Sequence, residues 1–450
     1  MPDFAKMSLE ELVRAEGYDC ECGKHHVCEL KFLKIGRGVI AQTPDMIEAL
    51  GKKKPFVVCD NNTYAVAGKK VDEILTAAKV DHVMYIVPGE RIAPSEWETG
   101  SIVMHFDPSC DMILAVGSGV INDLCKVVGH ATGRVTAVVG TAPSMDGYAS
   151  NSSSMEVNHV KVSLYNHGPM GILLDSEILA QAPMRMLWAG LGDMVAKYIA
   201  ICEWRISHLV TGEYYCEAIA ELMRSALRKM MAAADGIAKR DPDAIQSIAE
   251  GLVIAGIGMA YAEISRPASG LEHYFSHMWE MMALERNQPY DLHGIQVGIG
   301  TILTMKIYQK ILTIKPDRKR AEDHMKAFDP QQWEAQVRRI FGKTAGQIIE
   351  IEAKCGKNDS AKHAVRLNNI LNNWDKIIEI IHEELPDYDY LYDTMAKTGM
   401  PMTPAEINVP LQDVVDAFVG ARDIRDKYLS CSFLWDLGLT DEFAEYIRTL

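Results

Sequence analysis

Four short apolar runs, each followed by a polar loop and then a helix-forming segment, constrain the fold of this chain most strongly. The runs are VVC at residues 57–59, VMYIV at 83–87, MILAV at 112–116 and VTAVV at 135–139. Continuous apolar runs of this length are typical of parallel strands that are buried on both faces. Segments long enough to be crossover helices, such as 71–80 and 122–132, lie between them. We therefore expect a twisted parallel sheet flanked by helices.

After Pro183 the apolar residues recur at helical spacing, beginning with Leu187, Leu191 and Tyr198. The predicted fold class is thus an α/β parallel-sheet domain at residues 1–182, followed by an all-α domain at residues 183–450. Two domains also suit the length, because 450 residues are more than a single hydrophobic core usually accommodates. Further helices are expected at 217–238, 244–264, 271–285, 293–312 and 331–355. The charged segments 318–328 and 383–390 are expected to be connecting or solvated.

The formal net charge of -15 disfavours non-specific binding to nucleic acid or to an anionic membrane. An anionic substrate would therefore need a locally basic pocket. The start of the chain, MPDFAKMSLEELVRAEG, contains no apolar run typical of a secretory signal. The apolar stretch at 251–262 is too short to span a bilayer. We therefore expect a cytoplasmic protein without a membrane span.

Ten cysteines are scattered along the chain, which predicts reduced and mostly buried thiols rather than a disulfide framework. Only CECGKHH forms a cluster, with Cys20, Cys22, His25 and His26. A zinc site is one interpretation. However, C-x-C is tighter than the usual structural spacing and no second cysteine pair follows at a matching distance. A turn that enters the first strand is the favoured interpretation.

Three polar loops follow predicted strands. The first is VGSGVIND at 116–123, where glycines let the backbone approach a phosphate and the helix start supplies N–H donors. It is not a full G-x-G-x-x-G pattern, because Asn122 stands at the last position, and a simple tight turn is the alternative. The second contains Asp60, a ribose acceptor or else an Asx-turn or helix cap. The third is GTAPSMDGYASN at 140–151. Because ligands of open parallel sheets bind outside the strand ends, the three loops together predict one crevice.

The helical half contains a candidate metal site. His273 and His277 are four residues apart, so on a helix they share a face, and His293 begins a later apolar helix. Neutral imidazoles suit zinc, iron or nickel, and a carboxylate completes a site with an open position for substrate. The best carboxylate is Asp193, in the motif GLGD. The alternatives are a solvated histidine face and an ordinary Asp193 to Lys197 helix pair.

The motifs VGSGVIND, TAPSMDGYAS, GLGD, SRPASGLEHYFSH and HGIQVGIGT together resemble the iron-containing alcohol dehydrogenase superfamily, and within it the sn-glycerol-1-phosphate dehydrogenase branch. The resemblance covers most of the chain. The CECGKHH start and FLWDLGL at 433–439 are similar to the longer bacterial members. The resemblance implies a Rossmann-like nucleotide domain joined to a helical metal domain. It also implies a homodimer.

Position by position, the resemblance implies contacts to a nicotinamide cofactor, NAD or NADP, and ligands for one divalent metal, zinc or nickel and otherwise iron. The implied cofactor contacts are Asp60, Gly117, Ser118, Gly119, Val120, Ile121, Thr141, Ala142, Pro143, Ser144 and Ser150. The implied metal ligands are Asp193, His273 and His293, and the implied substrate contacts are Asp146, Asp193 and His277.

The activity that the resemblance implies is the reversible conversion of dihydroxyacetone phosphate to sn-glycerol 1-phosphate. Arg266 and Lys161 are candidate partners for the substrate phosphate, with surface ion pairs as the alternative. A glycerol dehydrogenase and a dehydroquinate-synthase-like cyclase would use the same scaffold. A catalytically silent nucleotide-binding protein is the hypothesis from a different functional class.

Overall fold

The computed structural model describes residues 2–89, 92–157 and 160–450, and within them the chain forms two compact units. We call them the sheet unit and the helical unit, and each is described by itself. The sheet unit comprises Met1–Met194, Cys216–Ala268 and Lys397–Met400. The helical unit comprises Val195–Tyr215, Ser269–Ala396 and Pro401–Leu450. Each unit is therefore built from separate stretches of chain. The division into domains at residue 183 stays a prediction, because compactness does not test which parts fold independently.

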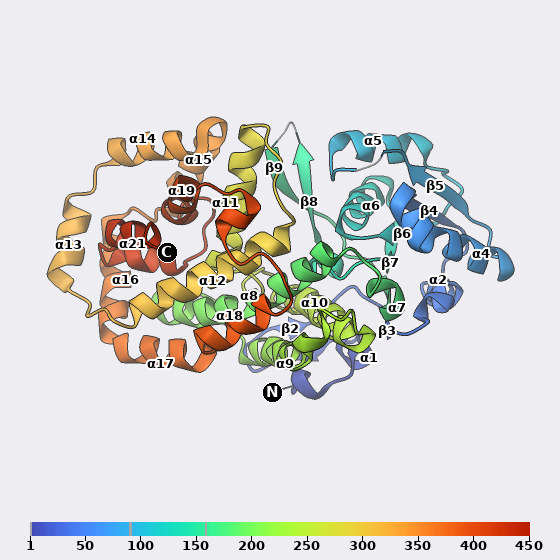
Figure 1. Cartoon of the computed structure of the whole chain (residues 1–450), viewed down its shortest axis with the longest axis horizontal. Coiled ribbons are helices and arrows are strands. Elements are labelled where there is room, and N and C mark those ends of the chain that lie inside the picture. The colour runs from blue at the N-terminus through green and yellow to red at the C-terminus, as the bar shows by residue number, and fades with distance from the viewer. Residues whose placement is uncertain (1, 90–91, 158–159) are drawn as a thin grey trace. The chain divides into compact units, whose positions relative to one another are not determined.

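A six-stranded parallel sheet forms the centre of the sheet unit, in the strand order β3-β10-β7-β6-β4-β5. Figure 1 shows β4 to β7 with helices around them. The strands are β3 (Phe32–Gly36), β4 (Pro55–Asp60), β5 (Val83–Val87), β6 (Met112–Gly117), β7 (Val135–Gly140) and β10 (Gly171–Asp175). After β4 the chain adds β5 on one side and then returns to add β6 on the other side. The carboxyl ends of β4 and β6 therefore form a topological switch point, where open α/β sheets bind their ligands.

Helices cover both faces of this sheet. The face that carries Val57 and Leu114 packs against apolar side chains of α2 (Thr43–Ala49) and α4 (Lys69–Ala77). The opposite face is covered by α5 (Glu96–His105) and α6 (Gly119–Thr132). Both faces of the central strands are consequently buried, which is why their sequences are continuously apolar instead of alternating.

The rest of the sheet unit consists of short elements and helices. Among them are α1 (Leu9–Leu12), α7 (Ser176–Leu179), α9 (Glu217–Ala233), α10 (Pro242–Ala262), the two-stranded pair β1 (Tyr18–Asp19) and β2 (His25–His26), and the antiparallel pair β8 (Ser152–Val157) and β9 (Val160–Tyr165). By length and composition α10 passes the test for a membrane span, but 72% of its apolar window is buried inside the protein. That degree of burial is typical of a core helix.

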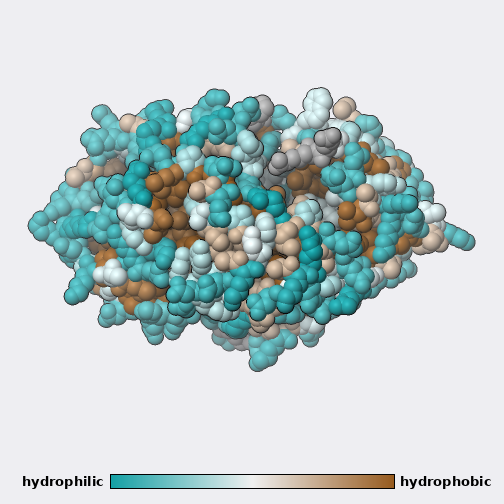
Figure 2. Space-filling view, viewed as in Figure 1, coloured by the Kyte–Doolittle hydropathy of each residue, from teal (hydrophilic) through white to brown (hydrophobic). Residues whose placement is uncertain are grey.

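The helical unit is built around α11 and α12. Helix α8 (Met184–Thr211) belongs to the sheet unit up to Met194 and to the helical unit from Val195. The others are α11 (Leu271–Glu285), α12 (His293–Ile311), α13 (Arg318–Lys326), α14 (Pro330–Phe341), α15 (Ala345–Cys355), α16 (Ser360–Asn372), α17 (Trp374–Glu384), α18 (Tyr388–Ala396), α19 (Leu411–Ala421), α20 (Ser430–Asp436) and α21 (Thr440–Ile447). Figure 2 shows hydrophilic residues over most of the visible face, as the high net charge leads one to expect.

The predicted fold class and the four predicted strands are confirmed. One helical prediction is wrong, and two segments that were expected to be connecting or solvated differ in part. The single helix expected at 331–355 is two helices, because the chain turns at Gly342, where φ is +50°. The segment 318–328 is solvated, with only Ala321 buried in α13, but it is a helix instead of a connection, and its first turn is capped by the Asp317 carboxylate, which accepts from the Lys319 N–H over 2.8 Å. In the segment 383–390, expected to be connecting or solvated, the connection is confined to the residues between the end of α17 at Glu384 and the start of α18 at Tyr388.

Candidate cofactor and metal site

The loop between β6 and α6 presents backbone N–H groups at the switch point of the sheet. Strand β6 ends at Gly117, Ser118 occupies the N-cap position without a side-chain capping bond, and α6 begins at Gly119. A Cβ atom at Gly117 would lie 2.6 Å from Cβ of Ile121, and one at Gly119 would lie 3.0 Å from Cε of Met145. Gly117 therefore needs to be glycine, whereas a Cβ at Gly119 would require only a small shift of the flexible Met145 side chain. A helix N-terminus at the end of such a glycine turn is a phosphate-binding arrangement.

The loop after β7 is fixed against the first loop. The N–H of Thr141 donates to the carbonyl of Gly117 over 3.1 Å, and the buried Tyr148 hydroxyl donates to the carbonyl of Ala142 over 2.7 Å. A Cβ atom at Gly190 of α8 would lie only 1.9 Å from the Pro143 carbonyl oxygen. The close approach of α8 to this loop thus explains why Gly190, the first residue of the GLGD motif, is a glycine.

Lys126 organises the same region, although its role was not predicted from the sequence. Its side chain on α6 is fully buried and forms an ion pair with Asp123 over 2.8 Å. Its Nζ also donates to the carbonyl of Gly147 over 3.2 Å. The Ser150 hydroxyl donates to that same carbonyl over 3.1 Å, so the predicted contact residue Ser150 is held within the loop. A lysine on the apolar face of an amphipathic helix is the signal that could have revealed Lys126.

Asp60 lies at the carboxyl end of β4 and caps the short helix α3 (Asn61–Thr63). Its Oδ1 accepts from the Thr63 N–H over 2.7 Å, and its own N–H donates to the Thr63 hydroxyl over 2.9 Å. The helix-cap alternative for Asp60 is therefore observed. The position beside the switch point is nevertheless the one where an acidic residue meets a ribose in this class of sheet.

Asp146 and Asp193 lie together within the sheet unit. Asp146 begins a 3-10 turn after β7, and its backbone N–H donates to Oδ2 of Asp193 over 2.9 Å. Asp193 lies on α8 and is completely buried. A charged hydrogen bond of this kind fixes the carboxylate orientation of Asp193.

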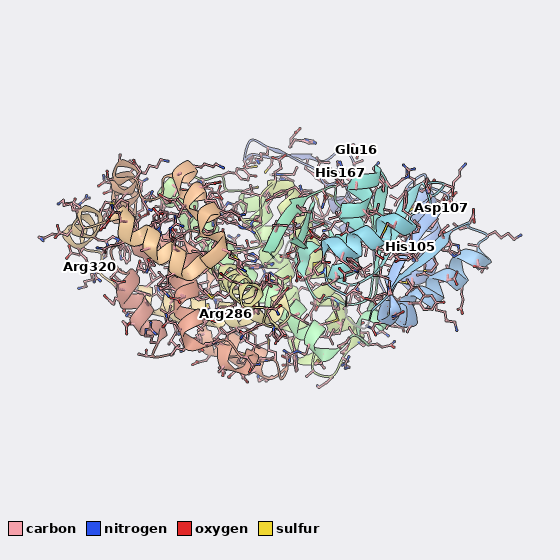
Figure 3. The ribbon with its side chains drawn as sticks, turned by 90° about the horizontal axis from the view of Figure 1, so that it is seen from above. Glu16, His105, Asp107, His167, Arg286 and Arg320 are labelled. Carbon is pink, nitrogen blue, oxygen red and sulfur yellow. The ribbon has the colours of Figure 1, made fainter. Side chains whose placement is uncertain are left out.

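The three predicted histidines lie together within the helical unit. The ring centroids of His273 and His293 are 5.4 Å apart, and those of His277 and His293 are 5.3 Å apart. Helices α11 and α12 approach closely here. A Cβ atom at Gly300 would lie only 2.5 Å from the carbonyl oxygen of Glu272, so the absence of a side chain at Gly300 allows the contact. The far end of α11 is fixed by Arg286, labelled in Figure 3, which donates to Asp413 of α19 over 2.9 Å. His273 and His277 share one face of α11 as predicted, with ring centroids 6.3 Å apart.

Buried hydrogen-bond acceptors orient two of the imidazoles. His273 Nδ1 lies 2.8 Å from Oε1 of Glu272, and Glu272 is completely buried. A carboxylate can only accept, so Nδ1 of His273 carries the proton and the lone pair is on Nε2. His293 Nδ1 lies 2.9 Å from the Ser276 hydroxyl and 3.2 Å from Glu280 Oε1. The role of Glu272 was not predicted, although a carboxylate directly before a candidate ligand is a signal that could have suggested it.

His277 has a different environment. Burial lowers its pKa well below the usual value, while hydrogen bonding to Glu280 opposes the shift and the positive charge of Arg425 reinforces it. A neutral imidazole can both donate and accept a hydrogen bond. Ligand atoms of His277, Glu280 and His293 also lie within 4.8 Å of one another, so the helical unit contains a second set of potential metal ligands.

The donor chemistry of the predicted metal ligands fits a divalent transition metal. Two imidazoles whose Nδ1 atoms are hydrogen-bonded to Glu272, Ser276 and Glu280 have the outer partners typical of metal-ligating histidines. Asp193 belongs to the sheet unit, and His273 and His293 belong to the helical unit. The structure thus brings together Asp146 with Asp193 in one unit, and His273 with His277 and His293 in the other.

The two candidate phosphate partners stay predictions. Arg266 is buried, with 1% of its surface exposed, so the alternative of a surface ion pair does not apply to it. Lys161 lies in β9, and its side chain falls outside the described residues.

Comparison with known proteins identifies the family. Residues 34–183 match the family described as iron-containing alcohol dehydrogenase. The glycerol-1-phosphate dehydrogenase [NAD(P)+] of Halalkalibacterium halodurans is 34% identical over 295 residues, which cover 65% of this chain and 74% of that protein. The chain belongs to the glycerol-1-phosphate dehydrogenase family.

A second relative matches nearly the whole chain. The enzyme of the same name from Bacillus licheniformis is 29% identical over 424 residues, which cover 93% of this chain and 92% of that protein. Among solved structures, glycerol dehydrogenase from Schizosaccharomyces pombe matches with a TM-score of 0.58 at 14% identity, covering 92% of this chain and 89% of that chain. This structural similarity concerns the fold, and it agrees with the sheet and the helical region described above.

Proposed function

We propose that this chain interconverts dihydroxyacetone phosphate and sn-glycerol 1-phosphate with NAD(P) as the hydride carrier. Its relatives in Halalkalibacterium halodurans and Bacillus licheniformis are named for this activity. The observation that carries the proposal is the pair His273 and His293, whose rings lie 5.4 Å apart on adjoining helices with buried acceptors behind them. Such a pair is poorly explained as a solvated face.

In this proposal Asp193, His273 and His293 hold one divalent metal, with zinc, nickel and iron all compatible with the ligand types. When bound, a divalent metal supplies a Lewis acid that polarises the ketone and stabilises the developing alkoxide charge. Glu272 keeps the His273 lone pair on Nε2, and Ser276 and Glu280 orient His293. Because these partners already orient the two imidazole rings, the rings need little reorientation when they bind the ion.

The cofactor would lie across the switch point of the sheet. The N–H groups from Gly117 to Ile121 would bind the pyrophosphate at the start of α6. The loop from Thr141 to Ser144 would border the nicotinamide half, held by Tyr148 and by the close approach of Gly190. Asp60 would accept from a ribose hydroxyl, and its negative charge would disfavour a 2'-phosphate and thus NADP.

Asp146 and His277 would contact the substrate. The carboxylate of Asp146 would accept from a substrate hydroxyl, while its N–H holds Asp193 in place. His277 stays neutral at pH 7 because its pKa is lowered by burial, so it can donate to one substrate oxygen and accept from another. A neutral imidazole is better suited to positioning the substrate and relaying a proton than to acting as a strong base.

A substrate comparison with the purified chain tests the proposal. We expect oxidation of NADH or NADPH on adding dihydroxyacetone phosphate, with sn-glycerol 1-phosphate as the product, and much slower oxidation with dihydroxyacetone. The opposite preference would favour a glycerol dehydrogenase. Consumption of a substrate without net oxidation or reduction of the cofactor would favour a cyclase of the dehydroquinate-synthase type. No turnover and no bound metal would favour a catalytically silent binding protein.

We also propose a homodimer in the cytoplasm. The dimer rests on the family, and the location on the acidic composition and the scattered thiols. Light scattering on the purified chain measures the assembly directly, and a monomeric mass would contradict the first part of this proposal.

A further inference from the structure

The CECGKHH segment forms a tight hairpin that presents ligating atoms. Strands β1 and β2 pair antiparallel, with Tyr18 opposite His26. Between them the N–H of Cys20 donates to the carbonyl of Lys24 over 3.1 Å, and that of Gly23 donates to the carbonyl of Cys20 over 3.0 Å. Gly23 has a φ of +87°, which lets the chain turn after Cys22. Glu16, labelled in Figure 3, lies two residues before this hairpin.

A third cysteine from far along the chain meets the hairpin within the sheet unit. Cys216 is the N-cap residue of α9 and is buried. Its Sγ lies 3.8 Å from Sγ of Cys20, which is 196 residues earlier, and 3.6 Å from Nε2 of His26. Cys22 Sγ lies 3.3 Å from the same Nε2. All four ligand atoms lie within 4.8 Å of one another.

These separations are close to the edges of a zinc tetrahedron. With Zn–S bonds of about 2.3 Å and Zn–N bonds of about 2.0 Å, tetrahedral angles place two sulfurs about 3.8 Å apart and a sulfur about 3.5 Å from a nitrogen. We propose that Cys20, Cys22, His26 and Cys216 bind a structural zinc ion. Cys216 supplies the ligand that the sequence pattern lacked, so the preference for a simple turn no longer holds.

The surroundings of His26 support ligation through Nε2. Its Nδ1 lies 2.8 Å from the backbone carbonyl of Tyr261 on α10. A carbonyl can only accept, so Nδ1 carries the proton and the lone pair on Nε2 points to the thiols. The His26 ring also stacks on the Tyr261 ring, with centroids 5.6 Å apart. A backbone carbonyl behind the second nitrogen is the usual outer partner of a zinc-bound histidine.

The donor set indicates a closed, structural site. Three thiolates and one imidazole fill four tetrahedral positions and leave none for a substrate. A disulfide between Cys20 and Cys216 would need their sulfurs about 2.05 Å apart, well below the 3.8 Å in the structure. The site shares no residue with Asp193, His273 and His293, so it can fail or succeed independently of the proposed function. Its effect would be to tie the first 26 residues to the start of α9 and to α10.

Metal analysis of the full-length chain tests this proposal. We expect the purified wild-type protein, grown with zinc and dialysed against a mild chelator, to retain one zinc ion that His273→Ala does not remove. Cys20→Ser and Cys216→Ser should each lose that ion. Cys28→Ser is the matched control, because Cys28 is a half-buried thiol on the same segment whose Sγ contacts the Leu12 carbonyl instead of the cluster. It should retain the ion.

A measurement on the wild type covers the case in which the serine variants do not fold. Titration with an organomercurial should release one zinc ion as the cluster thiols are modified, and cobalt in this site should show a thiolate charge-transfer band. Equal zinc content in wild type and a folded Cys216→Ser variant would overturn the proposal. So would a Cys20–Cys216 disulfide in freshly purified protein, or the absence of zinc from wild type grown with that metal.

Discussion

Nδ1 of His273 donates to Oε1 of Glu272, its neighbour in the chain, over 2.8 Å in the first turn of α11. Neither side chain is more than 5% exposed. The bond therefore forms away from solvent, where a carboxylate strongly fixes the orientation and tautomer of an imidazole. The binding strength of the proposed metal should consequently depend on a residue that does not ligate it.

Removing that carboxylate should weaken metal binding without removing a ligand. For Glu272→Ala we expect metal affinity to fall about 10-fold to 100-fold, because the ring of His273 loses its outer partner. Competition with a metallochromic chelator measures this change. Glu285→Ala, an exposed carboxylate at the end of the same helix, is the control and should bind metal normally. Equal metal affinities in Glu272→Ala and Glu285→Ala would mean that Glu272 does not support metal binding.

Removing the ligand itself should have a larger effect. His273→Ala should abolish both catalytic metal content and turnover, while nucleotide binding, measured by quenching of protein fluorescence, stays close to wild type. Full turnover in a His273→Ala protein that holds no metal at this site would refute the proposed chemistry.

His277→Ala distinguishes the two ligand sets in the helical unit. If Asp193, His273 and His293 hold the metal, this variant keeps the ion and loses turnover, because His277 would then contact the substrate and not the metal. If His277, Glu280 and His293 hold it instead, the variant loses the ion as well. Metal content and kcat measured on the same preparation decide between these sets.

Gly190→Ala tests the packing of α8 against the cofactor loop. The added Cβ would lie 1.9 Å from the Pro143 carbonyl oxygen, so the loop must move. Overpacking of this kind costs about 1–3 kcal/mol of unfolding free energy, and here it should also weaken NADH binding. Gly346→Ala in α15 is the matched control, because nothing lies within 4 Å of its added Cβ and alanine is favoured in a helix. Urea unfolding and NADH titration of both variants give the comparison.

Lys126→Met should destabilise the sheet unit. The substitution leaves Asp123 without its buried partner, and removing one member of a buried ion pair costs about 3–5 kcal/mol. The carbonyl of Gly147 loses a donor as well. A double variant with Asp123→Asn should recover part of the loss in urea unfolding. If Lys126→Met alone were as stable as wild type, the Lys126 ammonium would contribute nothing to the stability of the loop.

The central strands were predictable from the sequence because burial on both faces makes each one continuously apolar. Strand β3 was not, since it is an edge strand whose FLKIG sequence includes a lysine and only one fully buried residue. Strand β10, GILLD, offers three large apolar residues directly before α7, too few to separate a strand from a helix start. Helix α13 is stabilised by its Asp317 cap and by surface ion pairs such as Lys319 with Asp323, which leave no apolar periodicity to detect.

The site was predictable to the extent that its residues lie close together in the chain. His273 and His277 share one helix face, and the glycine turn at 117–119 follows a strand, so both are local patterns. Contacts such as Cys216 with His26, 190 residues apart, have no local signature. The roles of Glu272 and Lys126 depend on burial, which neighbouring letters do not specify.

The most direct test of the proposed reaction is to strip the purified chain of its catalytic metal and measure NAD(P)H oxidation by dihydroxyacetone phosphate before and after reconstitution. Turnover should fall to background in the stripped protein, and adding nickel or zinc should restore it. Undiminished turnover in protein shown to contain no metal at the histidine site would contradict the account.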